Sequence, residues 1–141
     1  MPADVLADTG ALLASLDKSD EWHEACRSAF RRLPLPLLTS EAVLTELFHM
    51  IGDFQPGIES VWQLLHSGLV LLAPIEHSEL HRIHALMSKY SDRGMDFADA
   101  TLVYLAERES IDAIFTVDQR DFSVYRIAGK RRFQLVPAGR P

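Results

Sequence analysis

Short apolar segments alternate with helical patterns along the chain, and this alternation restricts its fold more than any other feature. Residues with strand character occupy 4–7, 37–38, 69–72, 114–117 and 133–136. Apolar residues recur at helical spacing over 9–16, 21–32, 41–51, 58–65, 77–90 and 96–109. Strands that alternate with helices are typical of an α/β fold with a mostly parallel sheet. Segment 69–72 is apolar throughout, which predicts a strand covered on both faces.

The length of 141 residues suits one domain, 1–141, with a sizeable core. The longest apolar run, 69–75, has seven residues including Pro74, which is too short for a transmembrane helix. The N-terminus lacks a basic segment, so we expect no signal peptide and no membrane partner. Cys26 is the only cysteine, which excludes an internal disulfide and favours a reducing cytoplasm.

Four carboxylates lie at the end of an apolar segment or on a mostly apolar helix. They are Asp8, Glu46, Asp99 and Asp118. A carboxylate beside a core is costly unless it is paired, hydrogen-bonded or bound to a metal. The segments around these acids contain no lysine or arginine. A shared divalent cation with oxygen ligands is therefore the favoured partner.

Each of these acids also has a purely structural interpretation. Asp8 precedes a predicted helix and suits its N-cap. Asp96 and Asp99 have the spacing of an N-cap and the third helical residue. Asp118 and Asp121 follow a strand, where aspartate commonly forms turns. The joint pattern favours a site, because ligands of open α/β sheets bind beyond the carboxyl ends of the strands.

Helical geometry separates Glu46 from Glu41. Glu46 borders the buried face of its predicted helix, whereas Glu41 lies about 140° away in the exposed first turn. Glu46 is therefore the better site candidate. Thr116 lies two residues before Asp118 and faces the same side, where its hydroxyl could hold a carboxylate or a metal-bound water.

Four segments together resemble PIN-domain nucleases, and among them the VapC-type toxins of type II toxin–antitoxin pairs. The matching segments are 6–13 (LADTGALL), 39–47 (TSEAVLTEL), 95–103 (MDFADATLV) and 114–122 (IFTVDQRDF). They span nearly the whole chain in the family's order. The resemblance implies a PIN-like three-layer α/β/α sandwich with a mostly parallel central sheet.

The resemblance also implies hydrolysis of RNA phosphodiester bonds by a site that holds Mg²⁺ or Mn²⁺. The family's catalytic and metal-binding quartet falls on Asp8, Glu46, Asp99 and Asp118. In this interpretation the three aspartates hold the metal, and Glu46 binds a second ion or positions the attacking water. Thr116 matches the hydroxyl residue of the fourth segment, and Asp96 and Asp121 are supporting acids. Family members commonly form homodimers and are held inactive by a small antitoxin protein.

RNA affinity must come from cations, because most of the chain is acidic. Five of the 14 lysines and arginines follow Asp121 and no acid does, so residues 122–141 carry +5 and the remainder −11. The segment suits contact with phosphate, although a solvated basic hairpin is an equal interpretation. The RNA-binding candidates are Arg93, Arg120, Arg126, Lys130, Arg131 and Arg132.

Several alternatives remain open from the sequence. The chain could be a free-standing PIN nuclease without an antitoxin, or a catalytically silent protein that binds RNA or an antitoxin. A phosphatase with Asp8 as nucleophile is less favoured, because only Lys18 and Lys89 precede the basic tail as lysines. His77, His81 and His84 share a helical face, but no further ligand lies nearby in sequence to complete a zinc site.

Overall fold

A computed structural model describes residues 3–139. Five parallel strands form one sheet in the order β3-β2-β1-β4-β7. The strands are β1 (Val5–Ala7), β2 (Leu37–Thr39), β3 (Val70–Leu72), β4 (Ala113–Phe115) and β7 (Gln134–Val136). The helices are α1 (Thr9–Leu16), α2 (His23–Arg32), α3 (Glu41–Ile51), α4 (Gln55–His66), α5 (Leu80–Lys89), α6 (Phe97–Glu109) and α7 (Gln119–Phe122).

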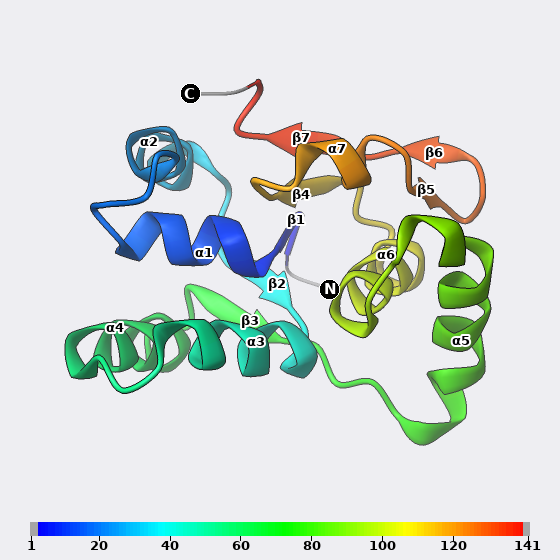
Figure 1. Ribbon diagram of the computed structural model, residues 1–141, viewed down its shortest axis with the longest axis horizontal. Helices are drawn as coiled ribbons and strands as arrows, with labels where there is room; N and C mark the ends of the chain where they lie inside the picture. The colour runs from blue at the N-terminus through cyan, green and yellow to red at the C-terminus, as the bar shows by residue number, and fades with distance from the viewer. Residues whose placement is uncertain (1–2, 140–141) are drawn as a thin grey trace.

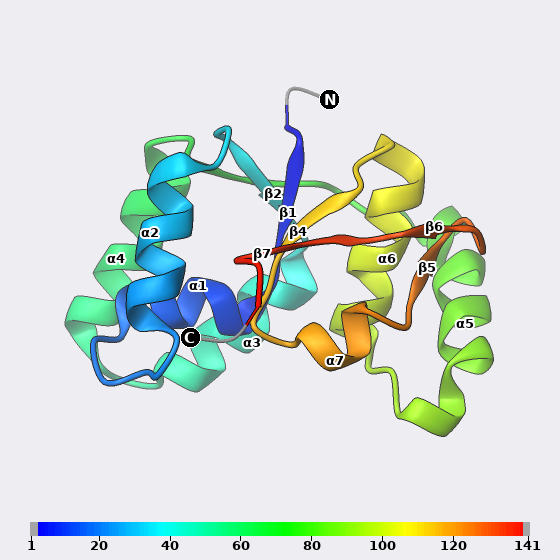
Figure 2. The ribbon, with the colours of Figure 1, turned by 90° about the horizontal axis from the view of Figure 1, so that it is seen from above.

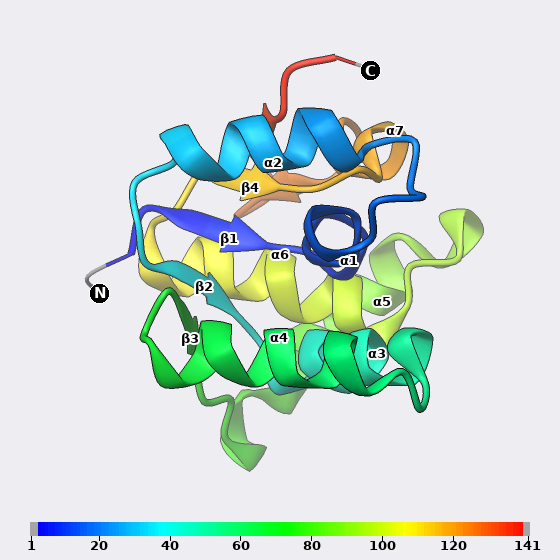
Figure 3. The ribbon, with the colours of Figure 1, turned by 90° about the vertical axis from the view of Figure 1, so that its left-hand side faces the viewer.

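Helices cover both faces of the sheet. Figure 1 shows α1, α2 and α4 on one side of the strands, with α5 and α6 on the other. The view in Figure 3 confirms this order, with α1, α2 and α4 in front of the sheet and α5 and α6 behind it. The predicted three-layer sandwich with a parallel central sheet is therefore confirmed.

Side-chain caps determine where the helices next to the carboxyl ends of the strands begin. Asp8 caps α1, and Ser40 caps α3 by accepting from the Val43 backbone N–H. Asp96 and Asp118 cap α6 and α7 in the same manner. Each cap satisfies a backbone donor that the helix itself leaves unpaired. The caps lie where the chain leaves a strand or loop, so they fix both the helix start and the position of the acid.

Two features differ from the sequence predictions, one at the edge of the sheet and one at the start of helix α4. Leu72, the last residue of the edge strand β3, is 41% exposed and lines an open groove. The predicted helices 41–51 and 58–65 leave residues 52–57 as a connection, but α4 already begins at Gln55. Pro56 is tolerated in the first helical turn, where its missing N–H has no helical partner.

Some boundaries shift by a few residues for local reasons. Asp20 forms a turn with the Trp22 backbone N–H, so α2 begins at residue 23 rather than 21. Residues 77–79 form a separate 3-10 turn before α5, stabilised by a capping box between Glu76 and Glu79. Strand β4 ends at residue 115, so Thr116 lies just beyond it.

The core is continuous between the sheet and the helices. Cys26 belongs to it, with no exposed surface, and burial raises the pKa of its thiol to about 12. Helix α6 is buried over most of its length, as its sequence predicted. Among residues 3–139, no helix has the length and apolar character needed to cross a bilayer.

Candidate active site

Asp8 is fixed by the pairing of the two central strands. Ala7 of β1 lies opposite Phe115 of β4, so the next residues, Asp8 and Thr116, meet beyond the carboxyl ends of both strands. Asp8 Oδ2 accepts a hydrogen bond of 2.9 Å from Thr116 Oγ1, and Oδ1 accepts one of 2.8 Å from the Thr9 N–H. The Thr116 hydroxyl thus holds the Asp8 carboxylate in this structure. Asp8 is only 6% exposed and is locked in one orientation.

Three further aspartates gather beside Asp8. Asp99 comes from the first turn of α6, Asp118 from the end of the β4–α7 connection and Asp121 from α7. Each offers one carboxylate oxygen, and these three oxygens lie within 4.8 Å of one another. Tyr125 donates a hydrogen bond of 3.2 Å to Asp99 Oδ2. The carboxyl ends of β1 and β4 therefore carry a compact set of oxygen ligands.

The pKa values report how strongly these acids interact. The pKa of Asp99 is raised to about 8. Burial is the largest cause, and the charges of Asp8, Asp96 and Asp118 add to it. Burial likewise raises the pKa of Asp8 to about 6, against the lowering effect of its hydrogen bonds, with Asp118 and Glu46 contributing repulsion. Burial, then the charge of Asp121, raises the pKa of Asp118.

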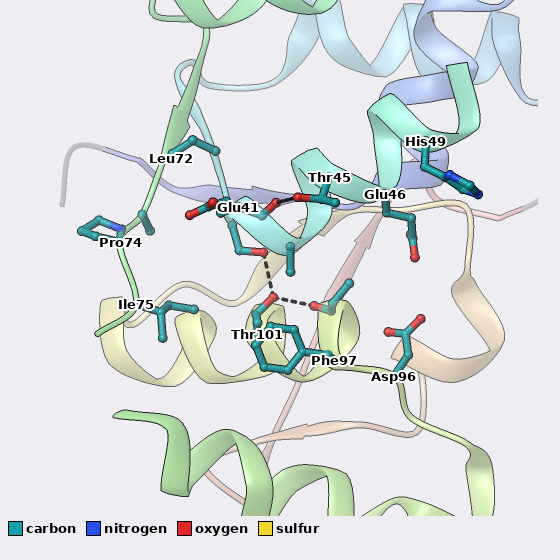
Figure 4. Close-up of a pocket in the computed structure, with 14 residues that line it drawn as sticks. Glu41, Thr45, Glu46, His49, Leu72, Pro74, Ile75, Asp96, Phe97 and Thr101 are labelled. Carbon is teal, nitrogen blue, oxygen red and sulfur yellow. Dashed lines mark hydrogen bonds between the residues drawn. The ribbon is translucent and has the colours of Figure 1, made fainter. Parts of the chain in front are cut away.

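Glu46 and Asp96 flank the opening to this cluster. In Figure 4 their carboxylates point toward one another, Glu46 from α3 and Asp96 from the start of α6. They belong to the wall of a groove of about 1070 Å³ between these helices. A hydrogen bond of 2.7 Å between Ser40 Oγ and Thr101 Oγ1 ties α3 to α6 at the floor of the groove. Of the six predicted acids, Asp99, Asp118 and Asp121 thus have oxygens within 4.8 Å of one another. Asp8, Glu46 and Asp96 lie near this group without belonging to it, and their charges raise the pKa values of its members or of Asp8.

The donor set fits a hard divalent cation. The ligands are all carboxylate oxygens, which Mg²⁺ and Mn²⁺ prefer. Burial, followed by the charges of neighbouring acids, raises the pKa values of Asp8 and Asp99, and a bound cation would favour their charged forms. In contrast, the three histidines that share a helical face form no cluster with a further ligand within residues 3–139, in line with the disfavoured zinc site. His77, His81 and His84 are exposed on the surface.

The six predicted RNA-binding cations do not share one environment. Arg93 forms an ion pair of 2.8 Å with Asp121, at the edge of the acid cluster. Arg131 pairs with Asp112, and the Arg126 guanidinium donates to three backbone carbonyls. Arg120, Lys130 and Arg132 are exposed, with no salt bridge within the described part of the chain.

Sequence reasoning missed the contacts that support the acids from a distance. Tyr125 is wholly buried and reaches Asp99 from a segment 26 residues away, and no local pattern marks it. The Arg93–Asp121 pair joins segments 28 residues apart. The Ser40–Thr101 bond was also missed, although Ser40 lies in a segment that carried the family resemblance.

Comparison with known proteins identifies the family. The sequence model of the PIN domain matches residues 5–129, most of the chain and all four predicted site acids. This chain belongs to the PIN-domain family. Over 136 residues, this PIN domain is 31% identical to ribonuclease VapC26 of Mycobacterium tuberculosis, a match that covers 94% of this chain and 100% of the relative.

Solved structures share the fold. The crystal structure of M. tuberculosis VapC20, described as a toxin that cleaves the sarcin–ricin loop, superposes with a TM-score of 0.74 at 16% identity. That match covers 82% of this PIN domain and 90% of VapC20. A toxin–antitoxin complex from Klebsiella pneumoniae gives a TM-score of 0.65 at 18% identity, covering 85% of this chain and 91% of that one. At these identities the likeness establishes the architecture.

Proposed function

We propose that this PIN domain, one domain over 1–141, is a Mg²⁺- or Mn²⁺-dependent ribonuclease and the toxin of a toxin–antitoxin pair. The observation that carries the proposal is the cluster of oxygens from Asp99, Asp118 and Asp121, which lie within 4.8 Å of one another beside the charge of Asp8. The near full-length relationship to a protein named ribonuclease VapC26 supports RNA as the substrate. The acids supply the ligands, and the relative supplies the substrate class.

The residues divide the work according to their environments. Asp8 and Asp99 are the metal ligands most in need of a cation, and Asp118 completes the set from the neighbouring connection. When bound, the ion lowers the pKa of a coordinated water and offsets charge on phosphoryl oxygens. Glu46, on the opposite wall of the opening, orients the attacking water or accepts its proton.

The supporting acids have lesser roles in this proposal. Asp96 caps α6 by accepting a hydrogen bond of 2.8 Å from the Asp99 N–H, and so fixes the first turn that carries Asp99. Asp121 offers one of the three clustered oxygens and is also paired with Arg93, so we propose that it supports the ligand set rather than leads it. Thr116 orients Asp8 and keeps its second oxygen aimed at the connection after β4.

Two rival functions fit the geometry less well. An aspartyl phosphatase is expected to have a lysine near the transferred phosphate, and only Lys18 and Lys89 precede the basic tail as lysines. A catalytically silent RNA- or antitoxin-binding protein has no need to keep acids whose pKa values are raised by burial and mutual repulsion. A free-standing nuclease would use the same site and differs only in lacking an antitoxin.

RNA cleavage by the purified protein tests the proposal. Structured and unstructured RNAs are incubated with Mg²⁺, with Mn²⁺ and with EDTA, using the parent chain, Asp99→Asn and Glu41→Gln. Glu41 is an exposed acid on the wall of the same groove and is the matched control. We expect cleavage that requires metal, is lost in Asp99→Asn and survives in Glu41→Gln. Metal-independent cleavage, or full activity of Asp99→Asn, would contradict the proposal of a metal-dependent ribonuclease that uses Asp99.

The partners are a separate part of the proposal. We expect a homodimer and a small cognate antitoxin, in line with the toxin–antitoxin complex among the structural neighbours. The single buried Cys26 suits a reducing compartment, and we propose the cytoplasm. Light scattering of the purified chain measures the oligomer, and a monomer at micromolar concentration contradicts the dimer.

A further inference from the structure

A small hairpin rich in cations has no role in the catalytic proposal. Strands β5 (Arg126–Ile127) and β6 (Arg131–Arg132) pair antiparallel and form a two-stranded sheet. Residues 126–132 contain four cations and no acid. In a chain with a net charge of −6, this segregation of positive charge is a feature that needs a physical reason.

The hairpin holds its cations against mutual repulsion. Arg126 and Arg132 are direct cross-strand partners, an arrangement in which like charges are destabilising. The Arg126 guanidinium is engaged by the carbonyls of residues 123–125, and Arg131 is engaged by Asp112 at 3.0 Å. Lys130 and Arg132 are exposed, with no ion pair among residues 3–139. These two cations are therefore available to an external anion.

The positive surface continues from the hairpin toward the acid cluster. Lys89, at the end of α5, brings its Nζ to 3.7 Å from the place where a Cβ on Gly129 would lie. The next residue, Tyr90, accepts a hydrogen bond of 3.0 Å from the Arg126 backbone N–H and so fixes the hairpin against α5. A few residues later, Arg93 contacts Asp121 at 2.8 Å. Figure 1 shows the hairpin above the end of α5, and Figure 2 shows α7 between the hairpin and the ends of the central strands.

We propose that Lys89, Arg93, Lys130 and Arg132 form a basic track that binds the phosphates of a single RNA strand and leads it to the acid cluster. The choice of RNA rests on the proposed nuclease function. An acidic body repels a polyanion, so the strand needs a positive approach that ends at the metal-binding acids. Arg93 is the inner end of this track, because Asp121 holds its guanidinium at the rim of the cluster.

The test measures RNA binding in EDTA, where no cleavage interferes. The probe is a fluorescein-labelled, unstructured oligoribonucleotide of about 12 nucleotides, a length within the usual site sizes for single strands. The track variant is Lys89→Gln/Lys130→Gln/Arg132→Gln. The control variant, Arg27→Gln/Arg31→Gln/Arg32→Gln, removes the same charge from exposed positions on α2, at the opposite side of the molecule in Figure 1. Fluorescence anisotropy is recorded over a series of salt concentrations.

We expect the track variant to lose at least about tenfold in affinity at low salt, with a log–log salt slope about 2 smaller, as three lost phosphate contacts require. The control variant loses the same net charge as the track variant. It should bind within about twofold of the parent chain at salt concentrations that screen this long-range effect. Equal losses in both variants, unchanged binding by the track variant, or no binding by the parent chain would overturn the proposal.

The same variants separate this proposal from the proposed function. If the parent chain cleaves RNA with Mg²⁺ but its RNA affinity is independent of the track, the nuclease stands and the track falls. If the track variant loses RNA affinity but no variant cleaves any RNA, the track stands and the nuclease falls. The melting temperatures of both triple variants check that their folds are intact. We expect intact folds because the substituted side chains are exposed, and the Lys89 ammonium lies over the Tyr90 ring at 5.4 Å from its centroid.

Discussion

Replacing Thr116 with valine should destabilise the protein in a way that depends on pH. Thr116 has no exposed surface, and its hydroxyl makes two hydrogen bonds of 2.9 Å, donating to Asp8 Oδ2 and accepting from the Asp118 N–H. Valine preserves the shape of the side chain and removes both bonds. The buried Asp8 carboxylate then keeps only the Thr9 N–H as a donor.

The magnitude follows from the charge of Asp8. A hydrogen bond to a charged group contributes about 1.5–3 kcal/mol, and a neutral one about 0.5–1.5 kcal/mol. The Asp118 N–H is only partly buried, so water replaces most of its lost partner. We therefore expect a loss of about 3 kcal/mol at pH 8, where Asp8 is ionised, and about 1 kcal/mol at pH 5, where it is protonated. The difference of about 2 kcal/mol corresponds to a further rise of roughly 1.5 units in the pKa of Asp8.

Urea denaturation in EDTA at the two pH values measures these losses. Thr116→Ser is the matched control: it keeps the hydroxyl and removes one buried methyl group, a loss of about 1 kcal/mol that should not depend on pH. On an Asp8→Asn background, Thr116→Val should also lose its pH dependence. Equal losses at pH 5 and pH 8 for Thr116→Val alone would refute the link between this hydroxyl and the Asp8 charge.

Three further predictions concern the same end of the sheet. A Cβ on Gly10 would lie 2.6 Å from Val117 Cγ2, so Gly10→Ala should lose about 1–3 kcal/mol in urea denaturation and regain most of it with Val117→Ala. The folded-state pKa values of Asp8 and Asp99, about 6 and about 8, exceed their ordinary value of 3.8; their stabilising contribution is thus complete below that value and is lost as pH rises toward 8. Differential scanning calorimetry in EDTA should show this loss of stability. In separate samples without EDTA, Mg²⁺ should stabilise the protein more at pH 8 than at pH 5. Equal stabilisation by Mg²⁺ at both pH values would contradict the prediction. Tyr125→Phe removes a donor that lowers the pKa of Asp99, so the acidic limb of the cleavage-rate profile should move to higher pH, and an unmoved limb would show that this bond does not act on the ionised acid.

The parts of the fold that depend on local sequence were predictable. Helix α3 has the predicted bounds, 41–51, because Ser40 caps its start and Gly52, with a positive φ of 65°, ends it. The end of β3 was not predictable in the same way. Whether Leu72 is covered depends on the place of the strand in the sheet, and an apolar run reads alike at an edge and at the centre.

The same distinction holds for the candidate site. The four acids of the quartet stand out in the sequence because each ends an apolar segment or lies on a mostly apolar helix. Their common position was an inference from topology, and their catalytic roles stay predictions. The pairing of Arg93 with Asp121 had no sequence signal, because arginine before a glycine-containing turn occurs equally on a solvated surface. Likewise, nothing in the sequence separates the six candidate cations. Three of them, Arg93, Arg126 and Arg131, have partners within the protein.

The acids of this site are structural residues as well as candidate ligands, and this decides how they should be tested. Asp8, Asp96 and Asp118 each cap a helix, so their carboxylates hold the backbone that aims the other acids. Alanine would remove the cap along with the charge, at a cost of about 1 kcal/mol per helix, and any lost activity could then reflect a displaced helix. Asparagine caps as well as aspartate and is a much weaker ligand for a divalent cation. Loss of activity in the asparagine variants, with unfolding free energies near the parent value, therefore assigns the carboxylate charge itself to the chemistry.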